Sequence, residues 1–342
     1  MRALAPSLLA ALLACGGETS APAPPAEPLS DGRYQMGTVL QITLHGADSA
    51  LLEELFARVE ELEERVSSWR ETSDVSRLSA AAGRGPQPVH EQVARLLEAC
   101  VGYTRLTKGS FDVTVGPLVK LWRAAGETGR RPSAQALAQA RALVGADKLR
   151  VDREAGTADL LRAGMSVDLG GVAKGTATDT IAERLAGVAL TAALIDFGGS
   201  SLHGLGAPPG DDGWRVLVHD GAGGFVGVVT LRDKALSVSS SLGQWSEIDG
   251  ERYGHVLDPR TGEPLRSGRT AVAVASSGEL AEALTKALLV LEQDEAIALV
   301  DGIAGAEALL LDEQRRRVMT SGFAAAVDYE AAEAQEPSNQ IR

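Results

Sequence analysis

The chain has 342 residues, of which 44% are hydrophobic and 23% charged, a balance typical of a globular protein. Its net charge of −13 argues against a nucleic acid as its partner, because no excess of cations is present to neutralise phosphates. A small phosphorylated ligand remains compatible with that charge, since a few local cations and backbone N–H groups suffice to bind it.

The first residues are typical of an export signal. Arg2 precedes a short apolar run, too short to span a bilayer, which ends in the lipobox-like sequence Leu12-Leu13-Ala14-Cys15. An ordinary secretory signal cut nearby is the alternative, but the cysteine stands where a lipoprotein would be cut and lipidated. We therefore expect a periplasm-facing protein that is lipid-anchored to the inner or outer membrane of a bacterium.

This leader divides the chain into four parts. We expect a lipoprotein signal peptide over 1–15, a proline-rich tether over 16–30, one folded domain over 31–330 and a polar tail over 331–342. Once Cys15 is lipidated, Cys100 is the only free thiol, so no disulfide within the chain is expected.

Hydrophobic spacing predicts the elements of the first half. Alternation predicts a strand over 38–44, and helical spacing predicts helices over 49–66 and 89–107. Residues 73–78 are expected to be a polar loop or turn. The stretch 111–118 combines a short β-type run with a Gly-Pro stop.

The second half mixes helices and strands without strict βαβ alternation, which favours an α+β fold. We expect helices over 133–144, 172–185, 279–291 and 294–300, a strand running into a glycine turn over 194–201, further strands over 214–218, 226–231, 236–239 and 270–275, and a closing hairpin from 308–311 and 318–319.

One turn, over 253–264, gathers several reactive groups. Pro259 and Gly262 predict a tight turn, because proline fixes φ and glycine tolerates positive φ. An imidazole, a carboxylate, a guanidinium and a hydroxyl lie within it, on His255, Asp258, Arg260 and Thr261. A hairpin turn capped by its own aspartate is the structural alternative.

Two glycine-rich turns could approach an anion. Residues 167–175 place backbone N–H groups and Lys174 before a helix, a pattern that suits a phosphate but is weak evidence alone. Asp179 on that helix could serve either structure or a ligand. Residues 196–199 form the second turn, and Trp69 could stack on a planar ligand or belong to the core.

These motifs, taken in order, resemble the ApbE family of FAD:protein FMN transferases. The pieces that carry the resemblance are 36–38, 73–78, 109–118, 168–175, 196–199 and 255–262, with a further match near 321–323. Members of the family bind FAD, coordinate Mg²⁺ at its pyrophosphate, and transfer FMN to a Ser or Thr hydroxyl of a target protein with release of AMP.

The resemblance implies roles for particular residues. His255 would be the base, in a loop shaped by Asp258, Arg260 and Thr261, and the backbone at Gly171 would lie at the metal. The residues that would contact FAD are Met36, Trp69, Asp112, Lys174, Asp179, Gly198 and Gly199. The implied partners are FAD and a Ser/Thr-containing acceptor protein of a membrane redox complex.

The sequence departs from the family at the helix over 279–291. Where the family has Asp and Thr as metal ligands, this chain has Glu282 and Lys286. Glutamate keeps an oxygen donor, but lysine removes a ligand and can pair with Glu282 across one helical turn without any metal. Thr285 lies about 100° around the helix, so we expect that it does not replace the lost ligand.

Three hypotheses follow, of which the last, a purely structural lipoprotein, leaves the glycine-rich loops unexplained. The first is a lipid-anchored flavin transferase with altered use of Mg²⁺. The second is a catalytically impaired flavin-binding lipoprotein of the same fold.

Overall fold

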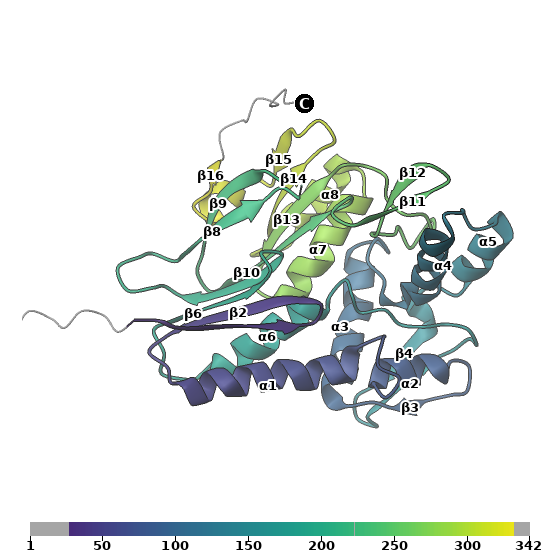
Figure 1. Ribbon diagram of the computed structural model, residues 1–342, viewed down its shortest axis with the longest axis horizontal. Coiled ribbons are helices and arrows are strands. Elements are labelled where there is room, and N and C mark those ends of the chain that lie inside the picture. Colours follow the sequence, from purple (N-terminus) through teal and green to yellow (C-terminus); the bar gives the residue numbers. More distant parts are fainter. Residues whose placement is uncertain (1–26, 222, 332–342) are drawn as a thin grey trace, which may run out of the picture.

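The computed structural model describes residues 27–331 except residue 222 (Figure 1). The expected signal peptide and most of the expected tether and tail lie outside these residues. The tether prediction is wrong at its end, because Leu29 and Ser30 already belong to a paired strand. Of the helices in the described part, none combines the length and the apolar character that a membrane span requires.

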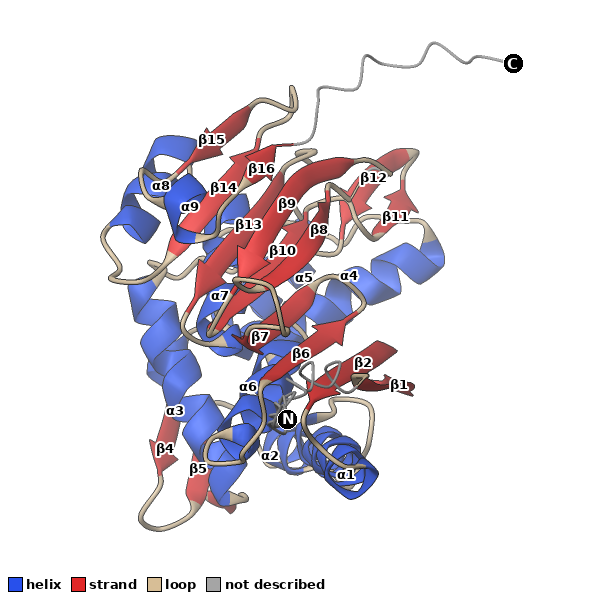
Figure 2. Ribbon diagram, turned by 90° about the vertical axis from the view of Figure 1, so that its left-hand side faces the viewer, coloured by secondary structure: helices blue, strands red, loops and turns tan. Residues whose placement is uncertain are grey.

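The centre of the fold is an antiparallel sheet of eight strands in the order β1-β2-β6-β7-β10-β13-β14-β15 (Figure 2). Its strands are β1 (Leu29–Gln35), β2 (Thr38–His45), β6 (Ala192–Phe197), β7 (Ser201–Gly206), β10 (Lys234–Ser240), β13 (Thr270–Ala275), β14 (Glu307–Leu311) and β15 (Arg317–Met319).

Three small sheets flank the central one. One is made by β3 (Gln87–Pro88), β5 (Thr157–Leu160) and β4 (Leu149–Asp152), another by β16 (Glu330–Ala331), β9 (Phe225–Leu231) and β8 (Trp214–His219), and the third by β11 (Trp245–Ile248) and β12 (Glu251–Gly254). The sequence did not predict β1, β3, β4, β5, β7, β11, β12 or β16.

Four helices cover one face of the central sheet: α1 (Ser49–Val66), α6 (Ala173–Leu185), α7 (Gly278–Val290) and α8 (Gln293–Asp301). The described chain also contains α2 (Asp74–Ala80), α3 (Glu91–Leu106), α4 (Gly116–Thr128), α5 (Ala134–Ala142), α9 (Phe323–Ala326) and two short 3₁₀ segments, Val113–Val115 and Ala146–Lys148. Cys100 is fully buried in α3.

Strand β13 shows how the sheet separates two cores. Its alanines at 271, 273 and 275 pack with α7 and α8, while its valines at 272 and 274 face β8 and β9. Successive side chains of a strand point to opposite faces, so small residues lie on the helix side. They allow α7 to lie close to the sheet.

Two local predictions were wrong. Residues 74–80 form a helix rather than a loop, because the Ser73 side chain caps it by accepting a hydrogen bond from the Ser76 N–H at 2.9 Å. Gly116-Pro117 begins α4 rather than ending a strand, since proline is well tolerated in the first turn of a helix. Mixed helices and antiparallel sheets make the fold α+β, as predicted.

Candidate functional site

The site is organised by the crossing of α6 and α7. A Cβ atom on Gly175 would lie 2.4 Å from the carbonyl oxygen of Gly278, so a larger residue would push the helices apart. Asp179 accepts hydrogen bonds from the backbone N–H groups of Gly278 at 2.6 Å and Glu279 at 2.9 Å. These bonds satisfy free donors at the start of α7, so Asp179 has a structural role.

A buried ion pair lies one to two turns further along α7. The Glu282 side chain is 4% exposed and that of Lys286 15%. The Lys286 ammonium donates to one carboxylate oxygen of Glu282, and the Ser201 hydroxyl of β7 donates to the other. The expected pair is therefore present, inside the protein, where both carboxylate oxygens need such partners.

Two hydroxyls complete the surroundings of the Lys286 ammonium. Its Nζ lies 3.4 Å from Ser239 Oγ of β10 and 3.4 Å from Thr285 Oγ1. The Thr285 hydroxyl lies closer to the Lys286 ammonium than its position around the helix predicts, because a helical side chain points back toward the preceding turn. Gly171 faces the same lysine: a Cβ on it would lie 3.5 Å from Lys286 Cε.

A second lysine approaches from α6. Lys174 Nζ donates to Ser200 Oγ at 2.5 Å, next to the predicted glycine turn. Burial lowers the pKa of Lys174 and the charge of Lys286 lowers it further, while Glu282 acts in the opposite direction. Burial alone would raise the pKa of Glu282, but the charges of Lys286 and Lys174 and the hydrogen bonds from Lys286 and Ser201 outweigh it, and the pKa is lowered. The three charges therefore sum to +1 (two lysines, one glutamate).

His255 lies near this cluster in a state suited to accept a proton. Its Nδ1 is 3.1 Å from the carbonyl oxygen of Gln244. A carbonyl can only accept a hydrogen bond, so we infer that Nδ1 carries the proton and that Nε2 has a free lone pair. The side chain reaches solvent, yet the surrounding protein removes enough water to lower the pKa of His255, and the charges of Lys286 and Lys174 lower it further.

The other predicted residues of this turn hold its shape. Arg260 Nε and Nη2 donate to the carboxylate of Asp258 at 3.0 and 2.9 Å. The N–H of Gly262 donates to the Asp258 carbonyl at 2.8 Å, and Thr261 Oγ1 accepts from the N–H of Glu263 at 3.2 Å. Asp258, Arg260 and Thr261 therefore position the loop that carries His255.

Met36 and Trp69 lie beyond the second glycine turn. A Cβ on Gly198 would lie 2.6 Å from Thr38 Oγ1, so this turn contacts the start of β2. The N–H of Met36 donates to Glu63 near the end of α1 at 3.0 Å. Trp69 follows that helix, is 73% exposed and stacks on Arg123, whose guanidinium carbon lies 4.0 Å from the ring centroid. The core alternative for Trp69 is wrong, and most of its ring is open to a ligand.

Asp112 has internal partners. One carboxylate oxygen accepts from the N–H of Thr114 at 2.8 Å and from its hydroxyl at 2.7 Å, and the other accepts from the N–H of Ala146 at 2.9 Å. These bonds hold the loop whose Phe111 ring faces Gly171. In this arrangement Asp112 supports the site through the loop.

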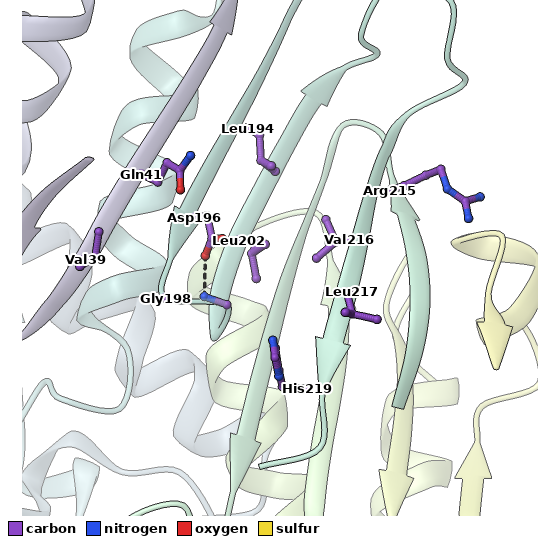
Figure 3. Close-up of a pocket in the computed structure, with 11 residues that line it drawn as sticks. Val39, Gln41, Leu194, Asp196, Gly198, Leu202, Arg215, Val216, Leu217 and His219 are labelled. Carbon is purple, nitrogen blue, oxygen red and sulfur yellow. Dashed lines mark hydrogen bonds between the residues drawn. The ribbon is translucent and has the colours of Figure 1, made fainter. Parts of the chain in front are cut away.

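A cavity of about 410 Å³ lies on the other face of the sheet, between β2, β6, β7 and β8 (Figure 3). Gly198 and Gly199 line it, and the dashed bond in Figure 3 is that of Asp196, which accepts from the Gly199 N–H at 2.6 Å. Val39 and Gln41 of β2 face this cavity, whereas Leu40 and Ile42 face the helices. The cavity therefore meets the lysine cluster only at the glycine turn.

Comparison with known proteins places this geometry in a family. The model of the ApbE family matches residues 36–310. The chain belongs to the ApbE family. A curated FAD:protein FMN transferase of Treponema pallidum is 30% identical over 340 residues, 92% of each chain, and one of Klebsiella pneumoniae is 31% identical over 310 residues, 85% of this chain and 87% of its own.

A solved structure agrees with the sequence comparisons. The flavin transferase ApbE of Vibrio cholerae superposes with a TM-score of 0.77 at 25% identity, covering 88% of this chain and 99% of its own. The shared fold and the motifs of the ApbE family make the Lys174–Lys286–His255 region the candidate active site.

The residues present do not fit the Mg²⁺ that the ApbE resemblance implies. Mg²⁺ requires an octahedron of oxygens at about 2.0–2.1 Å. Here an ammonium already lies among the oxygens of Glu282, Ser239 and Thr285, and it would repel a divalent ion. Within 27–331, leaving out 222, no three His, Cys, Asp or Glu side chains form a group that could hold a metal.

Sequence reasoning missed three hydroxyls of this ApbE site, on Ser200, Ser201 and Ser239, and it considered Thr285 only as a replacement metal ligand. A signal for Ser239 was available: Ala235, Ser237 and Ser239 alternate along β10 and therefore share the face that meets α7. Pairing across β7 then places Ser201 opposite Ser237.

Proposed function

We propose that this protein is an FAD:protein FMN transferase, which moves FMN from FAD onto a Ser or Thr hydroxyl of an acceptor protein and releases AMP. The observation that carries the proposal is the meeting of two lysines with His255 inside a fold shared with flavin transferases. The impaired alternative has no support among the curated relatives, which carry the transferase name.

The residues suggest how the transfer proceeds. The acceptor hydroxyl oxygen attacks the phosphorus on the FMN side of the pyrophosphate, and the bond from that phosphorus to the bridging oxygen breaks. AMP leaves with the bonding electrons, and the hydroxyl proton passes to Nε2 of His255. Lys174 and Lys286 face the charge that develops on the phosphoryl oxygens.

The leader extends the proposal to location. A lipid on Cys15 would hold the enzyme at a bacterial membrane, facing the periplasm, where an acceptor protein of a membrane redox complex is within reach. Mass spectrometry of the protein from a membrane fraction would detect the acylated Cys15; an unmodified N-terminus in that fraction would contradict this part.

The transfer itself is tested with the purified full-length protein, FAD and a candidate Ser/Thr acceptor. We expect the acceptor mass to increase by one FMN with equimolar AMP, and His255→Gln to reduce the rate by about 10²–10⁴-fold, the usual contribution of a general base. An acceptor panel that gains no FMN, although the protein retains FAD, would favour a binding protein instead.

A further inference from the structure

The ammonium of Lys286 contacts oxygens of two elements, and a third element supports one of them. Glu282 and Thr285 come from α7, Ser239 from β10, and Ser201 of β7 donates to Glu282 from the other side. Hydroxyl and carboxylate oxygens are ligands of hard cations. In this protein they surround a cation that is part of the chain.

The ammonium is held in place from several directions. The Lys286 side chain is 15% exposed and runs past Gly171 in the glycine turn before α6. Its ion pair with Glu282 joins two positions of one helix, so no loop movement can separate them. The charge therefore has a defined position beside a turn whose backbone and Lys174 suit an anion.

The balance of charge favours an anion next to Lys286. Glu282 neutralises only one of the two lysines, which leaves +1 among the three groups, and the charge of Asp196, which raises the pKa of Lys174, offsets part of this surplus. Both oxygens of the Glu282 carboxylate already accept hydrogen bonds, one from Lys286 and the other from Ser201, so a divalent ion would have to compete with these donors.

We propose that Lys286, with Lys174, binds the pyrophosphate of FAD in place of a divalent cation, so that this protein binds FAD and transfers FMN without Mg²⁺. The inference rests on the proposed function and specifies how its substrate is held. Lysine acts as a point charge toward phosphate and needs no further ligand.

The test measures FAD affinity by flavin fluorescence with the full-length protein, first in excess EDTA and then in excess Mg²⁺. We expect equal affinity in the two conditions. Lys286→Met should weaken FAD binding by about 10–100-fold, the loss typical of a charged hydrogen bond, while Lys286→Arg should retain most of it. Lys148→Met is the matched control: it removes one half-buried lysine whose ammonium donates to the carbonyl groups of Ala142 and Val144, and it should leave the affinity unchanged.

A double variant tests for a gain of Mg²⁺ dependence, so that the proposal does not rest only on a loss of FAD binding. Glu282→Asp with Lys286→Thr removes the ammonium and supplies a carboxylate and a hydroxyl in its place. We expect its FAD affinity to depend on Mg²⁺, and calorimetry to detect Mg²⁺ binding to this variant together with FAD but not to the wild type.

The outcomes separate the two proposals. FAD binding by the wild type that is lost in EDTA and restored by Mg²⁺ overturns this inference while leaving the transferase function intact. Undiminished binding by Lys286→Met in EDTA also overturns it. Absence of FAD binding by the wild type in every condition overturns both proposals.

Discussion

At the scale of single residues, each charge in the site shifts the pKa of the ionisable groups next to it. Glu282 remains charged although it is buried, because two lysines outweigh the cost of burial. The same lysines favour the neutral form of His255. A base that is neutral at pH 7 can accept a proton, so the cations that would bind phosphate also prepare the base.

The coupling between Lys286 and His255 gives a direct prediction. Removing a neighbouring positive charge makes the protonated imidazole less unfavourable, so Lys286→Met should raise the pKa of His255. NMR titration of the ring signals measures this shift, with the His255 signal assigned from its absence in His255→Gln. Lys148→Met should leave the titration unchanged. A His255 pKa that stays the same or falls in Lys286→Met would contradict the electrostatic account of the site.

At the scale of elements, the crossing of α6 and α7 determines where the site residues lie. Gly175→Ala would introduce a Cβ 2.4 Å from the Gly278 carbonyl oxygen, and we expect it to lower the free energy of unfolding by about 1–3 kcal/mol, as overpacking usually does. Because Lys174 is the neighbouring residue, FAD affinity should fall as well. Denaturant unfolding and flavin fluorescence measure the two effects.

The control for this variant is another helical glycine. No atom lies within 4 Å of a Cβ built on Gly102 in α3, so Gly102→Ala should stabilise the protein by about 0.4–1 kcal/mol through the lower entropy of the unfolded chain. Equal effects of the two substitutions would show that the helix crossing is looser than the structure indicates.

The elements also show what sequence could and could not predict. Residues 270–275 and 173–185 followed clear hydrophobic patterns, and their predictions were confirmed nearly to the residue. Strand β1 was not predicted because its side chains are mostly exposed, so they form no hydrophobic pattern. It is defined by its pairing with β2, which the local sequence does not show. The helix at 74–80 was missed because its cap, Ser73, resembles a loop residue until its hydrogen bond is seen.

The candidate site, like the fold, was predicted only in part from the sequence. The motifs identified His255, Lys174, Glu282 and Lys286, which the structure brings together. They could not separate Asp112, Asp179 and Asp258 from the contact residues, because a carboxylate that supports a loop and one that touches a ligand have the same sequence signature. The missing information was the partner of each oxygen, which depends on tertiary structure.

At the scale of the whole molecule, β1 is the first strand of the described part of the chain and lies at one edge of the central sheet. Deleting residues 2–28 keeps every strand of this sheet within the described residues, so this variant should keep the thermal midpoint of the full-length protein. Deleting 2–35 also removes β1 and exposes the edge of β2, and it should lower the midpoint and promote aggregation. Calorimetry and light scattering measure these outcomes, and an unaltered midpoint in the longer deletion would show that β1 is dispensable.

The glycine contact between α6 and α7 also keeps Lys174 close to the ion pair of Glu282 and Lys286. Glu282 and Lys286 share one helix and together amount to an electrically neutral dipole. Only Lys174, which is carried by the other helix, gives the group its surplus positive charge. The affinity of this site for an anion thus depends on the close contact of α6 and α7 at Gly175 and Gly278. A substitution that separates the two helices would therefore weaken anion binding without changing any ionisable group.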